Sequence, residues 1–288
     1  MTSRDPRAVL RSAGLRPKKR FGQNFLVAEP IARAIAEACV RAEEAGRARV
    51  VEIGAGTGAL TRHLAPRARS VVAIEHDREL VPLLEQELVQ TGVRVLEGDA
   101  QEVDVGELLG EAEAASPRVL CGNLPYALTG QMLRRAVAHA GGLERVVFMV
   151  QSEVAERLTA KPGTKAWGAL TVFVRAAFDV RRLLRAPPGA FHPPPEVSSA
   201  VVELTPLRPP RAEETERFRA LVRHAFEARR KTLRNAWSRL APGDAIERAA
   251  ARAGVSLDAR GETLDVEDFA RMAEELGTHE AESGSGAR

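Results

Sequence analysis

Residues 49–58, RVVEIGAGTG, join a short run of β-branched and apolar residues to a turn that contains three glycines. A run of this kind favours a strand, and the residues after Gly58 have a helical pattern. Glycine is needed in such a turn because a side chain would block a ligand that lies against the backbone at the carboxyl end of a parallel sheet. The stretch therefore predicts a strand–turn–helix unit that binds a nucleotide-like cofactor.

The spacing of the three glycines separates two classes of cofactor. In the dinucleotide fingerprint GxGxxG, the third glycine comes one residue later than Gly58 does here. The chain also has no recognisable set of residues for hydride transfer. The pattern therefore favours S-adenosylmethionine over NAD.

The sequence around this unit alternates between short apolar runs and helical patterns, which is typical of βαβ units and a parallel sheet. We expect helices at 31–44, 60–64, 78–90 and 130–140. The expected strands are 49–53, 70–75, 93–96, 118–121, 145–150, 178–184 and 199–204. The prediction is an α/β chain with a Rossmann-like, seven-stranded methyltransferase fold and a small C-terminal all-α domain.

Prolines at 206, 209 and 210 mark a boundary between two domains. Beyond it, apolar residues from Phe218 to Phe226 recur at helical spacing, and another face of the same expected helix carries Arg219, Arg223, Arg230 and Arg234. We expect a basic N-terminal arm at 1–28, a catalytic domain at 29–206, a helical domain at 207–277 and a disordered tail at 278–288.

The composition is that of a globular protein, with 44% hydrophobic and 28% charged residues. No apolar run has the roughly 18 residues of a membrane span, and the N-terminus has no apolar signal core. Cys39 and Cys121 belong to no CxxC pattern, so neither a zinc site nor a disulfide framework is indicated. We expect a soluble, cytoplasmic protein without a metal.

The net charge of +3 hides an uneven distribution of charge. Residues 1–20 hold seven Arg or Lys against one acid, and residues 223–239 hold six against one, whereas residues 262–288 hold eight acids against two arginines. Segregated basic segments indicate a polyanionic partner, because phosphate contacts supply most non-specific nucleic-acid affinity. Charge alone equally allows solvated helix faces.

Two acids follow expected strands on the rim where the cofactor would lie. Glu75 ends the strand after the glycine turn, at the distance where a carboxylate accepts both ribose hydroxyl hydrogens. Asp99 ends the next strand and can bond the adenine amine of the cofactor, with Ala100 offering its backbone. The alternative for each acid is a surface residue at a strand end.

Asn123, Leu124, Pro125 and Tyr126 follow the fourth expected strand. An exocyclic adenine amine is a poor nucleophile because its lone pair is delocalised into the ring. If the Asn123 side-chain oxygen and the Leu124 carbonyl accept its two hydrogens, the lone pair turns toward the methyl sulfonium. Pro125 would fix the turn and Tyr126 would stack on an extruded base. The alternative is a plain β-turn without a catalytic role, but the position of this tetrapeptide at the end of the fourth expected strand favours catalysis.

These segments together resemble the ribosomal RNA adenine dimethyltransferase family, in particular its bacterial small-subunit branch. The resemblance covers nearly all of residues 18–276. It rests on residues 19–26 (KRFGQNFL), 52–61 (EIGAGTGALT), 123–126 (NLPY), 151 with 153–157 (Q, EVAER), 191 with 193–195 (F, PPP), 199–202 (SAVV) and 229–235 (RRKTLRN).

The resemblance implies an enzyme that dimethylates two adjacent adenosines in a hairpin loop near the 3′ end of 16S rRNA, within an immature 30S subunit. It implies that Asn24 and Leu26 line the S-adenosylmethionine pocket with Gly54, Gly56, Glu75, Asp99, Ala100 and Asn123. Phe191 would help Tyr126 hold the flipped adenine, although spacing alone predicts a core residue. We expect a monomer that contacts RNA through Arg20, Arg223, Arg230, Lys231 and Arg234.

Three positions depart from the family pattern: Ala28, Ser152 and Glu196 stand where Asp, Lys and Lys are common. The last two changes remove positive charge near the expected RNA path. A large-subunit methyltransferase of the macrolide-resistance type is the nearest alternative. A DNA adenine methyltransferase is disfavoured because two prolines usually follow its Asp or Asn. A non-catalytic assembly factor would lack Asn123, Tyr126 or Glu75, and the chain retains all of them.

Overall fold

The computed structural model describes residues 5–110, 116–227 and 230–285, with side chains described as far as 277. Within these residues the chain forms two compact units. The first comprises the described residues within 1–155 and 180–206, and the second comprises those within 156–179 and 207–288.

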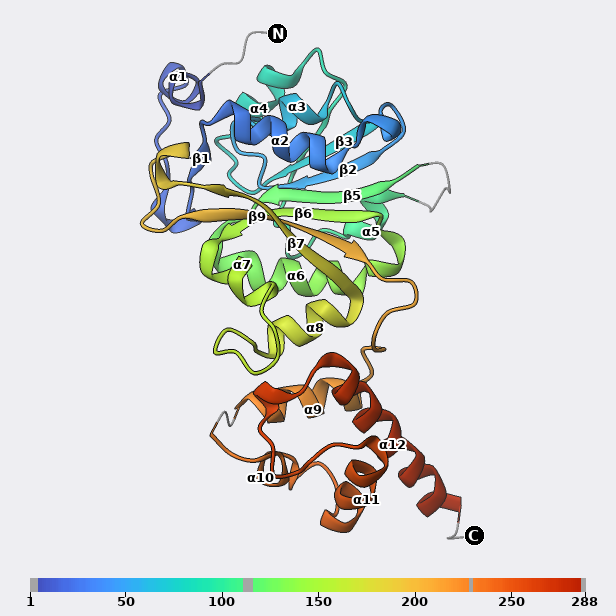
Figure 1. The fold of residues 1–288 in the computed structure, drawn as a ribbon. Coiled ribbons are helices and arrows are strands. Elements are labelled where there is room, and N and C mark those ends of the chain that lie inside the picture. Colours follow the sequence, from blue (N-terminus) through green and yellow to red (C-terminus); the bar gives the residue numbers. More distant parts are fainter. Residues whose placement is uncertain (1–4, 111–115, 228–229, 286–288) are drawn as a thin grey trace. The chain divides into compact units, whose positions relative to one another are not determined.

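The first unit is built on a seven-stranded sheet, as predicted (Figure 1). The strand order is β4-β3-β2-β5-β6-β9-β7. The strands are β2 (Arg49–Ile53), β3 (Ser70–Glu75), β4 (Arg94–Glu97), β5 (Arg118–Asn123), β6 (Arg145–Gln151), β7 (Phe178–Ala186) and β9 (Ser199–Pro206).

Strands β2 to β6 pair in parallel, and β9 pairs with β6 in the antiparallel direction. Strands β2, β5 and β6 are near-continuous apolar runs, because helices cover both faces of this part of the sheet. The chain order reverses at β2, whose neighbours are β3 and β5. Open α/β sheets bind ligands at this point, beyond the carboxyl ends of the strands.

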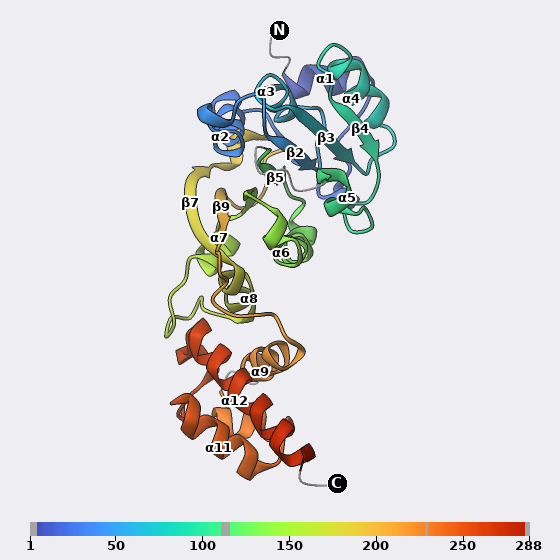
Figure 2. The same ribbon diagram turned by 90° about the vertical axis from the view of Figure 1, so that its right-hand side faces the viewer.

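Helices lie on both sides of the sheet, with α2 and α3 on one face and α6 on the other (Figures 1 and 2). Helix α2 starts with Glu29 and Pro30, and proline suits the first turn because its missing N–H would have no partner there. The helices of this part of the chain are α1 (Pro6–Ser12), α2 (Glu29–Cys39), α3 (Thr61–Leu64), α4 (Val81–Leu88), α5 (Val105–Leu109), α6 (Thr129–Ala138) and α7 (Ser152–Leu158).

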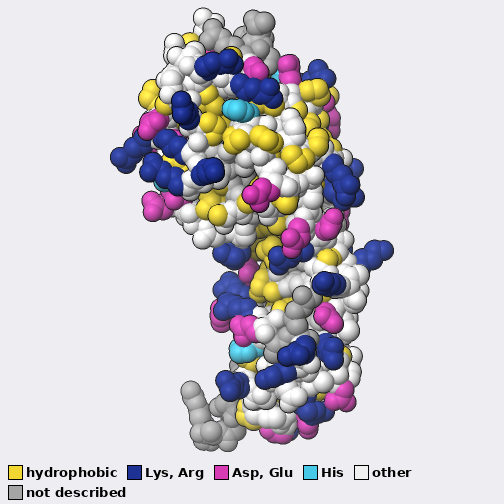
Figure 3. Space-filling model, turned by 90° about the vertical axis from the view of Figure 1, so that its left-hand side faces the viewer, with side chains coloured by type: hydrophobic (Ala, Val, Ile, Leu, Met, Phe, Trp, Pro, Cys, Tyr) yellow, Lys and Arg dark blue, Asp and Glu magenta, His cyan; other side chains and the backbone are white. Residues whose placement is uncertain are grey.

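A second, two-stranded sheet joins the N-terminal arm to a distant segment. Strand β1 (Phe25–Leu26) pairs antiparallel with β8 (Phe191–His192), so that Leu26 lies opposite Phe191. The sequence did not predict this sheet, because two residues are too few to show a strand period. The side of the unit that carries the arm shows hydrophobic side chains among basic and acidic ones (Figure 3).

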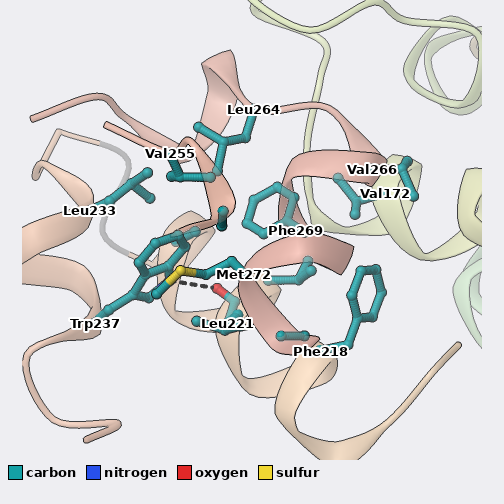
Figure 4. Close-up of a cluster of buried hydrophobic side chains, with 14 of the residues drawn as sticks. Val172, Phe218, Leu221, Leu233, Trp237, Val255, Leu264, Val266, Phe269 and Met272 are labelled. Atoms are coloured by element: carbon teal, nitrogen blue, oxygen red, sulfur yellow. Dashed lines mark hydrogen bonds between the residues drawn. The ribbon is translucent and has the colours of Figure 1, made fainter. Parts of the chain in front are cut away.

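The second unit is helical, with a core around Trp237 and Phe269 (Figure 4). The indole Nε1 of Trp237 donates a hydrogen bond to the Leu221 carbonyl at 2.9 Å. The helices are α8 (Ala169–Ala177), α9 (Glu216–Glu227), α10 (Leu233–Trp237), α11 (Gly243–Ala253) and α12 (Val266–Ser285). Residues 156–179, which the sequence analysis assigns to the catalytic domain, belong to this unit, because Trp167 and Val172 pack into its helical core.

The prediction that four arginines share one helix face is wrong. Helix α9 ends at Glu227 and α10 begins at Leu233, so Arg219 and Arg223 lie on one helix and Arg234 on another. Thr232 has an extended backbone and precedes α10, whose first N–H, from Leu233, donates to the Ala259 carbonyl at 2.8 Å. Arg230 lies in the turn between the helices.

Helix α12 extends through Ser285, so the segment predicted as a disordered tail at 278–288 begins as helix. Packing around Phe269 and Met272 stabilises the start of the helix. Each further residue then adds a backbone hydrogen bond without the free-energy cost of starting a new helix. Residues 286–288 lie outside the described residues, as does Arg229. No helix in the described part of the chain is long and apolar enough to span a membrane.

Candidate functional site

A cavity of about 450 Å³ opens at the reversal point of the sheet. The glycine turn, the ends of β3 and β5, the residues after β4 and the N-terminal arm all line it. The structure therefore brings together nearly every residue that the sequence predicted for the site: Arg20, Asn24, Leu26, Gly54, Gly56, Glu75, Asp99, Ala100, Asn123, Leu124, Pro125 and Tyr126.

Phe191 is the exception among the residues predicted around the cofactor and the target base. Its side chain is 3% exposed and packs in the core with Leu26 and Ala190, and it is not among the described residues that line the cavity. The pairing of β8 with β1 sets this position. Stacking of Phe191 on a target base thus stays a prediction.

The N-terminal arm packs against the glycine turn through Phe25. Gly56 has φ +58°, and a Cβ atom there would lie 3.1 Å from the Phe25 ring. Backbone conformation and space therefore both require glycine at this position. Phe25 was not predicted to be part of the site, because the family resemblance assigned only its neighbours Asn24 and Leu26 to the pocket.

Glu75 is held by the backbone at the edge of the cavity. One carboxylate oxygen accepts from the Gly56 N–H at 2.7 Å and the other from the Asp77 N–H at 2.9 Å. Burial raises the pKa of Glu75, and these two hydrogen bonds oppose that effect. Each oxygen keeps a lone pair that can accept a ligand hydroxyl.

Glu52 lies at the end of β2 with 2% of its surface exposed, and the sequence assigned it no role. Its Oε2 atom has no hydrogen-bond partner among the described residues, although the residue lines the cavity. Burial raises the pKa of Glu52 to about 8, and the negative charge of Glu75 adds to this rise. The signal in the sequence is an acid inside an apolar strand, where a core residue is expected.

Asp99 and Ala100 follow β4 on the same rim. One oxygen of the half-buried Asp99 side chain accepts from the Gln101 N–H at 2.8 Å, which fixes the local turn. The Gly98 N–H donates to the Glu75 carbonyl at 3.0 Å and so joins this turn to the end of β3. The second oxygen of Asp99 is an acceptor suited to an amine.

Asn123 ends β5 directly above the reversal point. Its Nδ2 donates to the Asn24 carbonyl at 2.9 Å, so the arm fixes the amide, and Oδ1 is the end that can accept a hydrogen. Gly122 precedes it because a Cβ there would lie 2.3 Å from the Ile53 carbonyl oxygen. The Leu124 N–H donates to the Met149 carbonyl at 3.2 Å and holds the next residue against β6.

Tyr126 begins a short 3₁₀ turn, Tyr126–Leu128, and its half-buried side chain lines the cavity. The hydroxyl lies 3.1 Å from Oγ of Ser199. Pro125 stands before it, with φ −53° and ψ 132°. Neither the bond to Ser199 nor its geometry was visible in the sequence, because the partners are 73 residues apart.

The arm is docked through Asp77, a residue that sequence reasoning missed. The Asp77 carboxylate is 2.7 Å from Lys18 Nζ and 2.8 Å from Gln23 Nε2. Burial would raise the pKa of Asp77, but the hydrogen bonds from Lys18 and Gln23 outweigh it and lower the pKa. The arm thus reaches the cavity through a defined, largely buried set of bonds.

The five residues predicted to contact RNA have different surroundings. The Arg20 guanidinium lies 4.7 Å from the Phe21 ring centroid, at the cavity. Arg223 is 3.9 Å from Glu216, and Arg234 is 2.6 Å from Glu247. Arg230 and Lys231 are exposed in the turn after α9. The structure therefore gives two of the five an acidic neighbour.

The described residues contain no group of His, Cys, Asp and Glu side chains that could hold a metal ion. Cys39 and Cys121 are both buried free thiols.

Comparison with known proteins gives one consistent family. Residues 14–278 match the model of the family described as ribosomal RNA adenine dimethylase. The chain is 41% identical over 278 residues to the ribosomal RNA small subunit methyltransferase A of Myxococcus xanthus, covering 94% of this chain and 95% of that protein.

Two solved structures are similar over 88% of this chain. A dimethyladenosine transferase from Plasmodium falciparum has a TM-score of 0.73 and 23% identity, covering 98% of that chain, and shares the fold. The 23S rRNA methyltransferase ErmE has a TM-score of 0.67 and 28% identity, covering 100% of that chain. With the family match and the relative from Myxococcus xanthus, the conclusion is direct: the chain belongs to the ribosomal RNA adenine dimethylase family.

Proposed function

We propose that this protein transfers methyl groups from S-adenosylmethionine to the N6 amines of two adjacent adenosines in the 3′-terminal hairpin loop of 16S rRNA, within an immature 30S subunit. One observation carries the proposal: Asn123, Leu124 and Tyr126 line the same cavity as Glu75 and the glycine turn. The residues proposed to bind the target amine, Asn123 and Leu124, thus line the same cavity as Glu75, which is proposed to bind the cofactor ribose. The name of the Myxococcus xanthus relative supports a small-subunit substrate.

The cavity suits S-adenosylmethionine, which supplies an electrophilic methyl group on a sulfonium. Glu75 would accept the ribose hydroxyls, and Asp99 would accept the adenine amine of the cofactor. Gly56 lets the Phe25 ring of the arm pack against the glycine turn beside the cavity. The buried Glu52 Oε2, which has no hydrogen-bond partner among the described residues, offers an acceptor to a cationic or hydrogen-donating group.

The chain's own part in the reaction is to hold the target amine. In the first transfer, Asn123 Oδ1 and the Leu124 carbonyl would each accept one amine hydrogen, which turns the nitrogen toward tetrahedral geometry. The nitrogen would take the methyl group as the methyl–sulfur bond breaks and would lose one proton to solvent, and the single hydrogen left on it would keep one of these acceptors in the second transfer. Asn24 holds the Asn123 amide through Nδ2, and Met149 holds Leu124 through its N–H, so both acceptors are positioned before the base arrives. Tyr126 would stack on the flipped adenine.

Replacing Asn123 by Ala tests this assignment. We expect methyl transfer from labelled S-adenosylmethionine to unmethylated 30S particles to fall by at least about a hundredfold, in line with the loss of a positioning group. Cofactor affinity, measured by calorimetry, should stay close to that of the unmodified protein. Glu75→Ala is the matched contrast, because it should weaken cofactor binding first. Near-normal turnover of the Asn123→Ala protein would disprove the proposed role.

The alternative substrate is large-subunit rRNA, because the structure is similar to that of the 23S rRNA methyltransferase ErmE. The higher identity to a small-subunit methyltransferase favours 16S rRNA. In a competition between unmethylated 30S and 50S particles at equal concentration, we expect label only in the 30S fraction. A non-catalytic assembly factor is disfavoured because Asn123, Tyr126 and Glu75 are all present and share one cavity.

A further inference from the structure

Tyr126 is anchored at both of its ends. Its backbone opens the 3₁₀ turn after Pro125, and its hydroxyl lies 3.1 Å from Ser199 Oγ. A tyrosine ring has two rotatable side-chain bonds, and a hydrogen bond at the far end of the ring restricts both of them. The backbone turn Tyr126–Leu128 sets where the side chain begins but leaves both of its rotatable bonds free.

Ser199 is placed on a rigid support. Its side chain is 1% exposed and it is the first residue of β9, directly opposite Gln151 of β6. The Ser152 N–H donates to the Ser198 carbonyl at 2.9 Å, which extends the β6–β9 pairing beyond Ser199. The serine hydroxyl is therefore presented by the antiparallel pair, and not by a mobile loop.

We propose that Ser199 is a positioning residue that holds the Tyr126 ring in the orientation in which it receives the target adenine. This inference rests on the proposed function, because it takes Tyr126 as the residue that stacks on the base. Without the bond, the ring can turn about its side-chain bonds, and part of the binding free energy of the base is spent on ordering it. Ser199 itself touches neither the base nor the cofactor in this role.

Tyr126 is the single tyrosine of the chain, so a tyrosine-specific probe reports on this residue alone. Protein labelled with 3-fluorotyrosine should give one ¹⁹F resonance. We expect Ser199→Ala to shift and broaden that resonance, and Ser199→Thr, which keeps a hydroxyl, to restore most of the original position. Ser198→Ala is the matched control, because Ser198 is the exposed neighbour on the same segment, and it should leave the resonance unchanged.

Kinetics then tests whether the bond matters for the reaction. Ser199→Ala and Tyr126→Phe should each lower kcat/KM for 30S particles by about three- to tenfold, which is the range for one neutral hydrogen bond. The kcat/KM of the double variant should be no lower than that of the less active single variant, since both changes remove the same bond. The dissociation constant for S-adenosylmethionine should change less than about twofold, whereas a general loss of structure would alter it as well.

Three outcomes overturn the inference: an unchanged ¹⁹F resonance in Ser199→Ala, a kcat/KM within about twofold of the unmodified protein despite a shifted resonance, or additive effects in the double variant. The ¹⁹F measurement needs no substrate. If the unmodified protein failed to methylate 30S particles, the proposed function would fall, while the resonance would still show whether Ser199 holds Tyr126.

Discussion

Glu52 and Glu75 lie at the ends of neighbouring strands, and the protein treats the two buried carboxyl groups differently. Glu75 receives two backbone hydrogen bonds, from Gly56 and Asp77. Glu52 Oε2 has no partner among the described residues, and burial raises its pKa to about 8. Glu75 is therefore prepared to accept hydrogen bonds from a ligand, whereas burial favours the neutral form of Glu52.

This difference predicts how stability depends on pH. The pKa of Glu52 is about 8 in the folded protein and 4.5 in a model peptide. Between these values the folded state binds more protons than the unfolded state, so the contribution of Glu52 to stability falls as the pH rises through this window. Glu52→Gln removes the titration. We expect the Tm of this variant, relative to the unmodified protein, to rise between about pH 5 and pH 8 in scanning calorimetry and to level off above that range.

Glu85→Gln is the control for that measurement, because Glu85 is an exposed acid on α4 and its loss removes the same charge. Its Tm should follow that of the unmodified protein across the pH range. Parallel Tm curves for Glu52→Gln and the unmodified protein would mean that Glu52 does not titrate in this window.

Among the structural elements, the N-terminal arm was expected to line the cavity through Asn24 and Leu26, but the contacts that dock it there were not predicted. Strand β1 pairs with β8, Asn24 binds Asn123, and Lys18 and Gln23 bind Asp77. The residues joined by these side-chain hydrogen bonds are far apart in the sequence, 54 residues for Gln23 and Asp77 and 99 residues for Asn24 and Asn123. The arm is therefore part of the site and not merely a basic extension.

Asp77→Asn should loosen this arm. The change keeps the shape of the side chain but removes the charge that both Lys18 and Gln23 bind, and a charge-assisted hydrogen bond contributes about 1.5–3 kcal/mol. Local opening of the arm should increase, so limited trypsin cleavage after residues 18–20 should become at least about fivefold faster. Cofactor affinity should fall in parallel, because Asn24, Phe25 and Leu26 line the cavity.

Glu79→Gln is the control variant, since Glu79 Oε1 also pairs with Lys18 Nζ, at 3.0 Å, but its side chain is 59% exposed. Exposed ion pairs contribute little, so cleavage should change much less than in Asp77→Asn. Equal cleavage rates in Asp77→Asn and the unmodified protein would show that Asp77 does not hold the arm.

The elements also show what a sequence can and cannot predict. The central strands were predictable because Val50, Val147 and their neighbours form apolar runs bounded by glycine and turn residues. The positions of the site residues followed, since Glu75 and Asn123 end β3 and β5 and Asp99 follows β4. The Tyr126–Ser199 bond and the docking at Asp77 were not predictable, because no local pattern marks a contact between distant segments. The single helix expected to carry Arg219 to Arg234 was wrong, because no glycine or proline in the sequence marks the break between α9 and α10.

At the scale of the whole molecule, charge should govern the affinity for RNA. Arg234 already faces Glu247 at 2.6 Å, whereas Arg230 and Lys231 are exposed in the turn after α9. Replacing Arg230 and Lys231 together by Gln should weaken binding to 30S particles. The slope of log affinity against log salt should become shallower by about two, if each residue contacts one phosphate.

A second variant removes the same charge from paired residues. Arg248 lies 2.8 Å from Asp244, and Arg252 lies 2.6 Å from Glu275. Replacing both arginines by Gln should leave the salt slope nearly unchanged. Equal slopes for the two double variants would mean that the turn after α9 does not contact phosphate and that net charge alone sets the affinity.

The central claim is that the cavity selects two adjacent adenosines of 16S rRNA for dimethylation. It is tested most directly by incubating the protein and S-adenosylmethionine with 30S particles from a strain that lacks this modification, and then mapping the 16S rRNA by mass spectrometry. We predict that two neighbouring adenosines in the 3′-terminal hairpin each gain two methyl groups. Methylation at any other nucleotide, or none in the presence of bound cofactor, would contradict the account.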